Sequence, residues 1–289
     1  MRIVRVLCPN PGLRELEGTN TWIVGEAPSV VVDPGPAMSG HVGEVAATAG
    51  RVAAILLTHD HPDHAPGAAE LSAVTGATVH AIRPPDGGER LRDGQVIAHD
   101  SVEIRVIATP GHSPDSASFF VPSASALLTG DTVLGRGTSV IDPPEGDLTA
   151  YVRSLRRLRD LRPRTIHPGH GPLVLDGVAK LEEYLEHRRM REEQVLSSLA
   201  DGGRTIEDMV AVIYAGYPSA LHELAARSVL AHLLKLEAEG RAKRRTRDGE
   251  QRWSLDEPRA CARCGRPVKG RAKLCASCSL AVLQESAPD

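Results

Sequence analysis

Short apolar runs rich in β-branched residues alternate with helix-like segments through the first 175 residues. The apolar runs predict buried strands, and turn-forming residues such as Asp33-Pro34-Gly35 and Gly130-Asp131 follow them. The predicted strands are 3–7, 21–24, 30–32, 52–57, 102–108 and 126–129, and the predicted helices are 38–49, 66–75 and 147–161. We therefore expect an α/β domain over 1–175, with its active site in the loops that follow the strands.

The pattern changes at about residue 176. A long charged helix is predicted over 180–199, a second helix begins at Thr205 with a capping sequence, and a third covers 219–239. The pattern of residues 241–255 predicts a hairpin of two strands about an Asp248-Gly249 turn. Three helices followed by a hairpin predict a winged-helix-like domain over 176–255, and 256–289 forms a separate tail.

Potential metal ligands gather in one short segment, Thr58-His59-Asp60-His61-Pro62-Asp63-His64. His59 and His61 are two residues apart in a predicted loop, so both rings can point the same way, whereas Asp63 and His64 are adjacent and should diverge. One segment can thus supply two metal positions. Three other loops supply further ligands of the kind that catalytic zinc takes: His112, Asp131 and His170.

This ordered set resembles the metallo-β-lactamase superfamily, which implies an αββα sandwich and two zinc ions in the catalytic site. Iron or manganese can also occupy a site of histidines and aspartates of this kind. By that resemblance His59, His61 and His112 bind one zinc ion, Asp63, His64 and His170 bind the second, and Asp131 bridges the two. Asp33, in the sequence Val31-Val32-Asp33-Pro34-Gly35, matches a position that supports the ligands by hydrogen bonds.

The chemistry expected of such a site is hydrolysis. Two zinc ions share a water molecule and lower its pKa, and the resulting bridging hydroxide attacks a carbonyl carbon or a phosphorus atom. Asp63 is expected to orient that water or to carry a proton to the leaving group. The metal motif leaves the substrate open.

The sequence around 130–158, 166–172 and 186–199 is similar to the β-lactamase-like protein 2 family, and the resemblance extends over roughly 1–255. Members of that family include endoribonucleases that act on single-stranded RNA. A basic strip on the predicted hairpin is compatible with phosphate binding, although it can also be a solvated surface or a wall of the active site. It consists of Arg241, Lys243, Arg244, Arg245 and Arg247.

Composition changes this picture in two ways. Aromatic residues make up only 3% of the chain, and Tyr214, Tyr217 and Trp253 are predicted to be core residues, which leaves few partners for base stacking. The net charge of −3 excludes a generally basic nucleic-acid-binding surface. The family resemblance and the basic strip make an RNA phosphodiesterase the first hypothesis. The alternative is a small-molecule acyl or thioester hydrolase similar to glyoxalase II, with which the low aromatic content and the negative net charge are compatible, although the glutathione-binding pattern of glyoxalase II is not recognisable here.

The tail contains two C-x-x-C pairs, and this spacing predicts a structural zinc ion held by Cys261, Cys264, Cys275 and Cys278. No run approaches the roughly 20 apolar residues that span a bilayer, and no signal peptide is evident, so we expect a cytoplasmic protein without membrane contact. In a reducing compartment, clustered cysteines favour metal over disulfides. Cys8 stands alone and is predicted to be a buried structural thiol.

Overall fold

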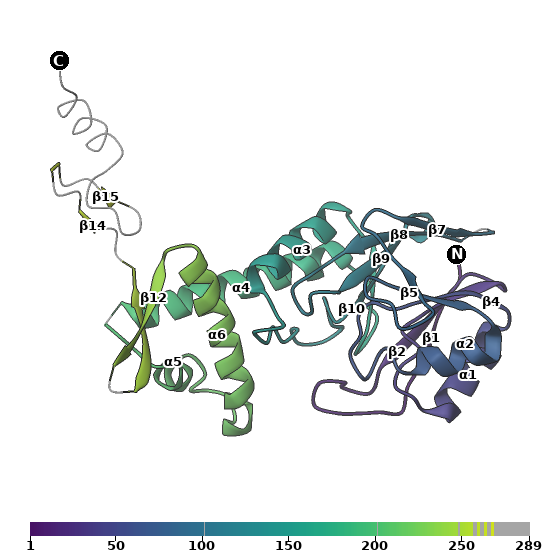
Figure 1. Cartoon of the computed structure of the whole chain (residues 1–289), viewed down its shortest axis with the longest axis horizontal. Coiled ribbons are helices and arrows are strands. Elements are labelled where there is room, and N and C mark those ends of the chain that lie inside the picture. Colours follow the sequence, from purple (N-terminus) through teal and green to yellow (C-terminus); the bar gives the residue numbers. More distant parts are fainter. Residues whose placement is uncertain are drawn as a thin grey trace, which may run out of the picture. The chain divides into compact units, whose positions relative to one another are not determined.

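The chain is described by a computed structural model (Figure 1), which covers residues 1–100, 102–200, 202–247, 249–256, 259–260, 263–264 and 267–268. It divides into two compact units, Met1–Met190 and Arg191–Asp289, and the helix α4 (Gly177–Leu199) contributes residues to both. The domain limits near 175 and 256 stay predictions from the sequence.

The first unit contains two sheets. Antiparallel and parallel pairings build the first in the order β1 (Ile3–Leu7), β2 (Asn20–Val24), β3 (Ser29–Val32), β4 (Val52–Leu56), β5 (Thr78–Ala81) and β6 (Glu89–Arg90). The second has the order β11 (Thr165–Pro168), β10 (Ala126–Gly130), β9 (Ala117–Val121), β8 (Val102–Ala108) and β7 (Val96–His99), with the short helix η1 (Pro122–Ala124) between β9 and β10.

The two sheets enclose the main hydrophobic core. Along β3, Val30 and Val32 belong to this core together with Phe119 and Leu128 of the second sheet. Val31 points to the opposite face, where it packs with residues of α1 (Ser39–Ala49) and α2 (Gly67–Thr75). A strand buried on both faces needs an unbroken apolar run, and this is why β3 and β4 stand out in the sequence.

Helix α3 (Leu148–Asp160) lies on the side of the paired sheets opposite to α1 and α2 (Figure 1), which completes the expected αββα order. Asp147 caps its first turn by accepting a hydrogen bond from Ala150 N at 2.9 Å. The buried side chains recur at helical spacing: Leu148, Tyr151, Leu155 and Leu158. This one-sided apolar stripe explains why the helix was readable from the sequence.

The second unit consists of the end of α4, the helices α5 (Ile206–Ile213) and α6 (His222–Ala238) with the short η2 (Ser219–Leu221), and the hairpin β12 (Ala242–Arg247) and β13 (Glu250–Leu255). Thr205 forms the predicted capping box with Asp208. Trp253 is fully buried among Met209, Val229 and Leu233. A brief pairing of β14 (Arg259–Ala260) with β15 (Pro267–Val268) follows.

The structure confirms the predicted fold and its main elements, with corrections. α4 begins at Gly177, three residues before the predicted start. Tyr214 and Trp253 are core residues, but Tyr217 is 51% exposed, so its prediction as a core residue was wrong. Among the described residues, no helix has the length and apolar character needed to cross a membrane.

Candidate metal centre

The predicted ligands follow the carboxyl ends of strands in both sheets. β3 and β4 run parallel, as do β10 and β11, so their ends meet on one edge of each sheet. Asp33 follows β3, the 58–64 segment follows β4, His112 follows β8, Asp131 follows β10 and His170 follows β11. Residues distant in sequence therefore converge because the topology brings these loops together.

Two clusters of potential ligand atoms result. Within each cluster the donor atoms lie within 4.8 Å of one another, which is a spacing that a single ion can span. The first cluster consists of His59, His61 and His112, and the second of Asp63, His64, Asp131 and His170. These are the seven residues selected from the sequence, and Asp131, for which the resemblance implied a bridging position, falls in the second cluster.

Asp131 lies between the two clusters. Its Oδ2 atom is 3.8 Å from Nε2 of His112 in the first cluster. Its Oδ1 atom is 3.4 Å from Nε2 of His64 and 3.3 Å from Nε2 of His170 in the second. A carboxylate in this position can supply one oxygen to each cluster.

The ring nitrogens that face away from the clusters are held by protein groups. His112 Nδ1 donates to the carbonyl of Val140 at 2.9 Å, and His170 Nδ1 donates to that of Gly18 at 3.2 Å. His61 Nε2 lies 3.4 Å from a carboxylate oxygen of Glu145. Such outer partners fix the tautomer of a metal-binding histidine and turn its lone pair inward.

Asp33 and Thr58 orient the two innermost rings. The buried Asp33 carboxylate accepts hydrogen bonds from Thr58 N at 2.7 Å and Thr58 Oγ1 at 2.6 Å, and it lies 2.9 Å from Nδ1 of His64. Because the Thr58 hydroxyl has one proton and gives it to Asp33, it accepts from His59 Nδ1 at 2.9 Å. His59 therefore carries its proton on Nδ1.

The consequence is a buried lone pair that points into the centre. His59 Nε2 is buried and makes no hydrogen bond within the described residues. An unpaired buried nitrogen costs stability unless a ligand reaches it. This atom, the inward-facing nitrogens around it and the intervening carboxylate match the donor set of a divalent transition metal ion, so the residues fit a metal.

Electrostatics favour positive charge at the centre. Burial opposes ionisation of Asp131, yet the adjacent His64 and His170 hold its pKa well below the usual range. Burial likewise works against protonation of His170, but the charge of Asp131 and hydrogen bonds to Asp131 and Asp63 raise its pKa to about 9. Bound cations would likewise stabilise the closely spaced carboxylates of Asp63 and Asp131.

Sequence reasoning missed several supporting residues. Thr58 is part of the histidine motif, but nothing in the sequence indicated that its hydroxyl orients a ligand. Glu145 lies in a loop more than 80 residues from His61 and has no motif of its own. The buried Arg188 donates to the carbonyl of Ser139, whose hydroxyl donates to the carbonyl of Asp131 at 2.6 Å. Only the three-dimensional fold brings these groups together.

The basic strip is largely neutralised within its own unit. Arg241 pairs with Glu192 at 2.8 Å, Lys243 with Asp256 at 2.9 Å, and Arg244 with Glu237 at 3.3 Å. Arg245 is exposed, and the side chain of Arg247 lies outside the described residues. These ion pairs reduce the positive charge that the sequence alone suggested.

The remaining predicted residues are cysteines. Cys261, Cys275 and Cys278 lie outside the described residues, and Cys264 is exposed, so the zinc site of the tail stays a prediction. Cys8 is fully buried as expected, and burial raises the pKa of its thiol to about 11.

Comparison with known proteins agrees with this architecture. The family model of the metallo-beta-lactamase superfamily matches residues 14–87 and 77–170, and that of the beta-lactamase associated winged helix domain matches 205–253. The chain belongs to the metallo-beta-lactamase superfamily, whose members are mostly hydrolases.

Two curated relatives match along most of their length. An atrochrysone carboxyl ACP thioesterase from Aspergillus chevalieri is 32% identical over 271 residues, 88% of this chain and 87% of the relative. A beta-lactamase-like protein 2 homolog from Caenorhabditis elegans is 34% identical over 257 residues, 82% of this chain and 85% of the relative.

A solved structure supports the fold alone. A metallo-beta-lactamase family protein from Thermus thermophilus superposes with a TM-score of 0.73 at 23% identity, and covers 88% of this chain and 98% of its own.

Proposed function

We propose that this chain is a metal-dependent hydrolase of acyl thioesters, with two divalent ions, zinc in the first instance, held at the two clusters. The observation that carries the proposal is the inward lone pair of His59, fixed by Thr58 and Asp33 beside six other potential ligands. Bound ions of this kind polarise a carbonyl oxygen and lower the pKa of a water molecule.

The protein groups have separate roles in this scheme. His59, His61 and His112 would hold one ion, His64 and His170 would hold the other with Asp63, and Asp131 could supply an oxygen to each. The Asp63 carboxylate lies 3.0 Å from His170 Nε2 and remains 23% exposed, so it can also reach a water molecule. It is the group best placed to orient that water and to pass a proton to the departing thiolate.

Two observations favour a thioester over RNA. Glu145, half exposed beside His61, adds negative charge at the centre and disfavours a polyanion. The basic strip offers fewer available charges than its composition suggests, because three of its members are ion-paired. A relative named as an ACP thioesterase, similar over 88% of the chain, supports the same choice.

RNA phosphodiester hydrolysis is the second candidate. The same clusters could stabilise charge on a phosphoryl group, and the exposed Arg245 is available to a phosphate. The similarity to a beta-lactamase-like protein 2 homolog supports retaining it. Thioester hydrolysis, which was the alternative hypothesis from the sequence, therefore becomes the first proposal, and RNA hydrolysis becomes the second.

The test is turnover of matched substrates by the full chain after loading with zinc, manganese or iron(II). Release of thiol from acyl-pantetheine thioesters is measured beside cleavage of short single-stranded RNAs. The variant His112→Gln should lose at least 100-fold in the thioester reaction, because it removes an expected metal ligand. His99→Gln, a partly buried histidine of β7 outside both clusters, is the matched control.

Thioester turnover that requires metal and His112 supports the proposal. RNA cleavage with the same dependence, in the absence of thioester turnover, would replace it with the second candidate. If the protein cleaves neither thioesters nor RNA with any of the metals, the hydrolase assignment is refuted for both substrate classes.

A further inference from the structure

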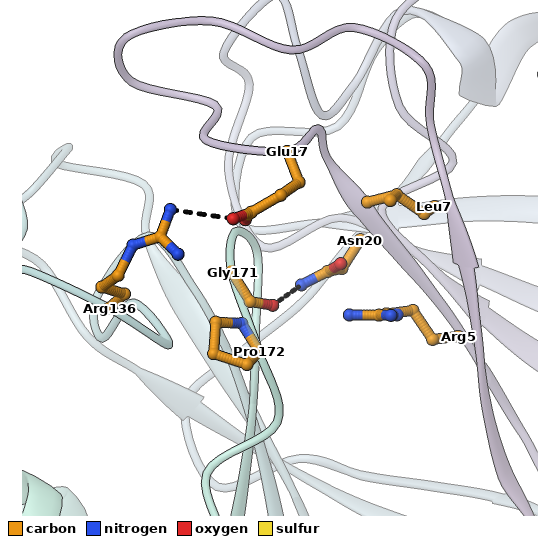
Figure 2. Close-up of a pocket in the computed structure, with 7 residues that line it drawn as sticks. All are labelled: Arg5, Leu7, Glu17, Asn20, Arg136, Gly171 and Pro172. Carbon is orange, nitrogen blue, oxygen red and sulfur yellow. Dashed lines mark hydrogen bonds and ion pairs between the residues drawn. The ribbon is translucent and has the colours of Figure 1, made fainter.

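A pocket beside the His170 loop lies outside both metal clusters (Figure 2). Its volume is about 250 Å³, and its walls include Arg5, Leu7, Glu17, Arg136 and Pro172. Gly171 and Pro172 directly follow His170 in the chain. The pocket is therefore joined to the candidate metal centre through a single short loop.

The edge strand β1 forms one wall. Arg5 and Leu7 are exposed on one face of this strand, while Val6 between them is buried on the other. Leu7 is paired with Asn20 of β2, which is fully buried. Asn20 Nδ2 donates to the carbonyls of Pro168 and Gly171 at 3.0 and 2.9 Å, and these two bonds bracket the His170 loop.

The loop after β10 forms the opposite wall and carries Arg136. Gly135 N donates to the carbonyl of His170 at 2.9 Å. Gly171 has a φ of +81°, and a Cβ atom at that position would lie only 3.2 Å from Arg136 N. The glycine lets the two backbones approach, which holds Arg136 next to the loop that bears a metal ligand.

Within the described residues, only one of the two arginine side chains that line the pocket is ion-paired. Arg136 Nη2 lies 2.8 Å from a carboxylate oxygen of Glu17. The hydrogen bond from Arg136, with a smaller effect of the Arg5 charge, lowers the pKa of Glu17. The Arg5 guanidinium makes no ion pair or hydrogen bond within the described part of the chain, so the lining has one positive charge in excess.

The apolar parts of the wall limit the class of ligand. Leu7 is 38% exposed, and Pro172 is exposed on the other side. An inorganic ion alone would leave this surface in water, whereas an organic molecule with a terminal anion would cover it. Guanidinium groups suit oxygen anions because they donate two parallel hydrogen bonds.

We propose that this pocket binds an anionic group, a carboxylate or a phosphate, on an apolar chain of the molecule that the metal centre cleaves. The anion contacts Arg5 and competes with Glu17 for Arg136. The role as a substrate subsite rests on the proposed hydrolase function, but the anion site itself can be tested without turnover.

The experiment compares binding of hexanoate, hexyl phosphate and hexanol to the metal-loaded full chain by titration calorimetry. The four proteins are the wild type, Arg5→Gln, Glu17→Gln and the control Arg105→Gln. Arg105 is an exposed arginine of β8 that pairs with Glu103, away from this pocket. The control also accounts for any anion that binds the metal ions, since that share is common to all four.

We expect one or both anions to bind more tightly than hexanol, and the tighter anion identifies the head group. Arg5→Gln should weaken anion binding about three- to fivefold, as for a partly exposed charge pair. Glu17→Gln should strengthen it by a similar factor, because the competing carboxylate is gone. Arg105→Gln should bind as the wild type does.

Equal affinities across the four proteins, or no detectable anion binding, would overturn the site. A second measurement tests its role: the ratio of KM for a thioester with a terminal anion to KM for its neutral counterpart should rise in Arg5→Gln. Should the anion bind as expected while no thioester is cleaved, the proposed function fails and the anion site stands.

Discussion

Asp33 Oδ2 lies 2.9 Å from Nδ1 of His64, and both side chains are almost completely buried. The backbone of Asp33 is in the left-handed region at φ +52°, a conformation that non-glycine residues adopt at a cost. The surrounding hydrogen bonds to Thr58 hold the residue there. This contact determines which nitrogen of His64 faces the metal centre.

Asp33→Asn should therefore weaken metal binding with only local structural change. The amide cannot accept all three hydrogen bonds that the carboxylate takes from Thr58 N, Thr58 Oγ1 and His64 Nδ1, since one of its two oxygen acceptors becomes a donor. Loss of such an outer partner costs about 10- to 100-fold in metal affinity. Competition with a chromogenic chelator measures this, and Asp86→Asn, in an exposed loop, is the control. Unchanged metal affinity in Asp33→Asn would show that Asp33 does not support the metal ligands.

The Thr58 hydroxyl gives a sharper pair of variants. Thr58→Val keeps the shape but leaves His59 Nδ1 without its acceptor and removes one of the three donors to the Asp33 carboxylate, at a cost of about 1–3 kcal/mol in the free energy of unfolding. Thr58→Ser keeps the hydroxyl and should retain most of the metal affinity. Urea unfolding and chelator competition measure the two effects. If serine and valine impair metal binding equally, the hydroxyl does not orient His59.

Arg188 is expected to support the loop that carries Asp131. It is buried, its guanidinium lies 5.2 Å from the Tyr151 ring centre, and it donates to the Ser139 carbonyl. Arg188→Met retains the aliphatic stem but leaves that carbonyl unpaired, so it should destabilise the chain by about 2–3 kcal/mol.

Thermal unfolding measures the loss. The control is Arg105→Gln, which changes an exposed ion pair and should alter stability by no more than about 0.5 kcal/mol. A similar, small effect of both substitutions would show that Arg188 does not hold this loop.

His167 predicts a pH dependence of stability. Burial lowers the pKa of His167 to about 4, against about 6.5 in an unfolded chain. The unfolded state therefore takes up this proton first as pH falls. The stabilisation is complete above pH 6.5 and is lost as the pH decreases toward 4.

His167→Gln removes this titration, so between pH 7 and 4.5 it should lose about 2 kcal/mol less stability than the wild type. Urea unfolding of metal-free samples measures the difference, because the ligand histidines then contribute equally to both proteins. Parallel stability curves would contradict the assigned pKa.

The sequence predicted what short-range signals encode. Strands β3 and β4 are continuous apolar runs that end in turns, and the histidine motif lies in the loop that follows β4. Strands such as β5 and β11 were not predicted, because each has only four residues and includes a histidine. The division of seven ligands between two clusters came from family resemblance, since spacing within one loop cannot reveal which distant loops converge.

Long-range partners could not be read in this way. The ion pair of Arg241 with Glu192 joins residues 49 apart, on the hairpin and on α4. A count of positive charges in the hairpin therefore overestimated the available charge. The outer partners of the histidines, Glu145 and the carbonyls of Val140 and Gly18, likewise depend on the folded backbone.

Metal content per chain, measured by mass spectrometry on the wild type and on the double variant Asp131→Ala with His170→Ala, shows directly whether the two clusters hold metal ions. We expect two ions at the clusters of the wild type, and a third if the cysteine tail binds zinc. The double variant should lose at least one ion together with hydrolytic activity. A metal content that is the same in both proteins would mean that these residues hold no metal, and the metal-dependent hydrolase would have to be abandoned.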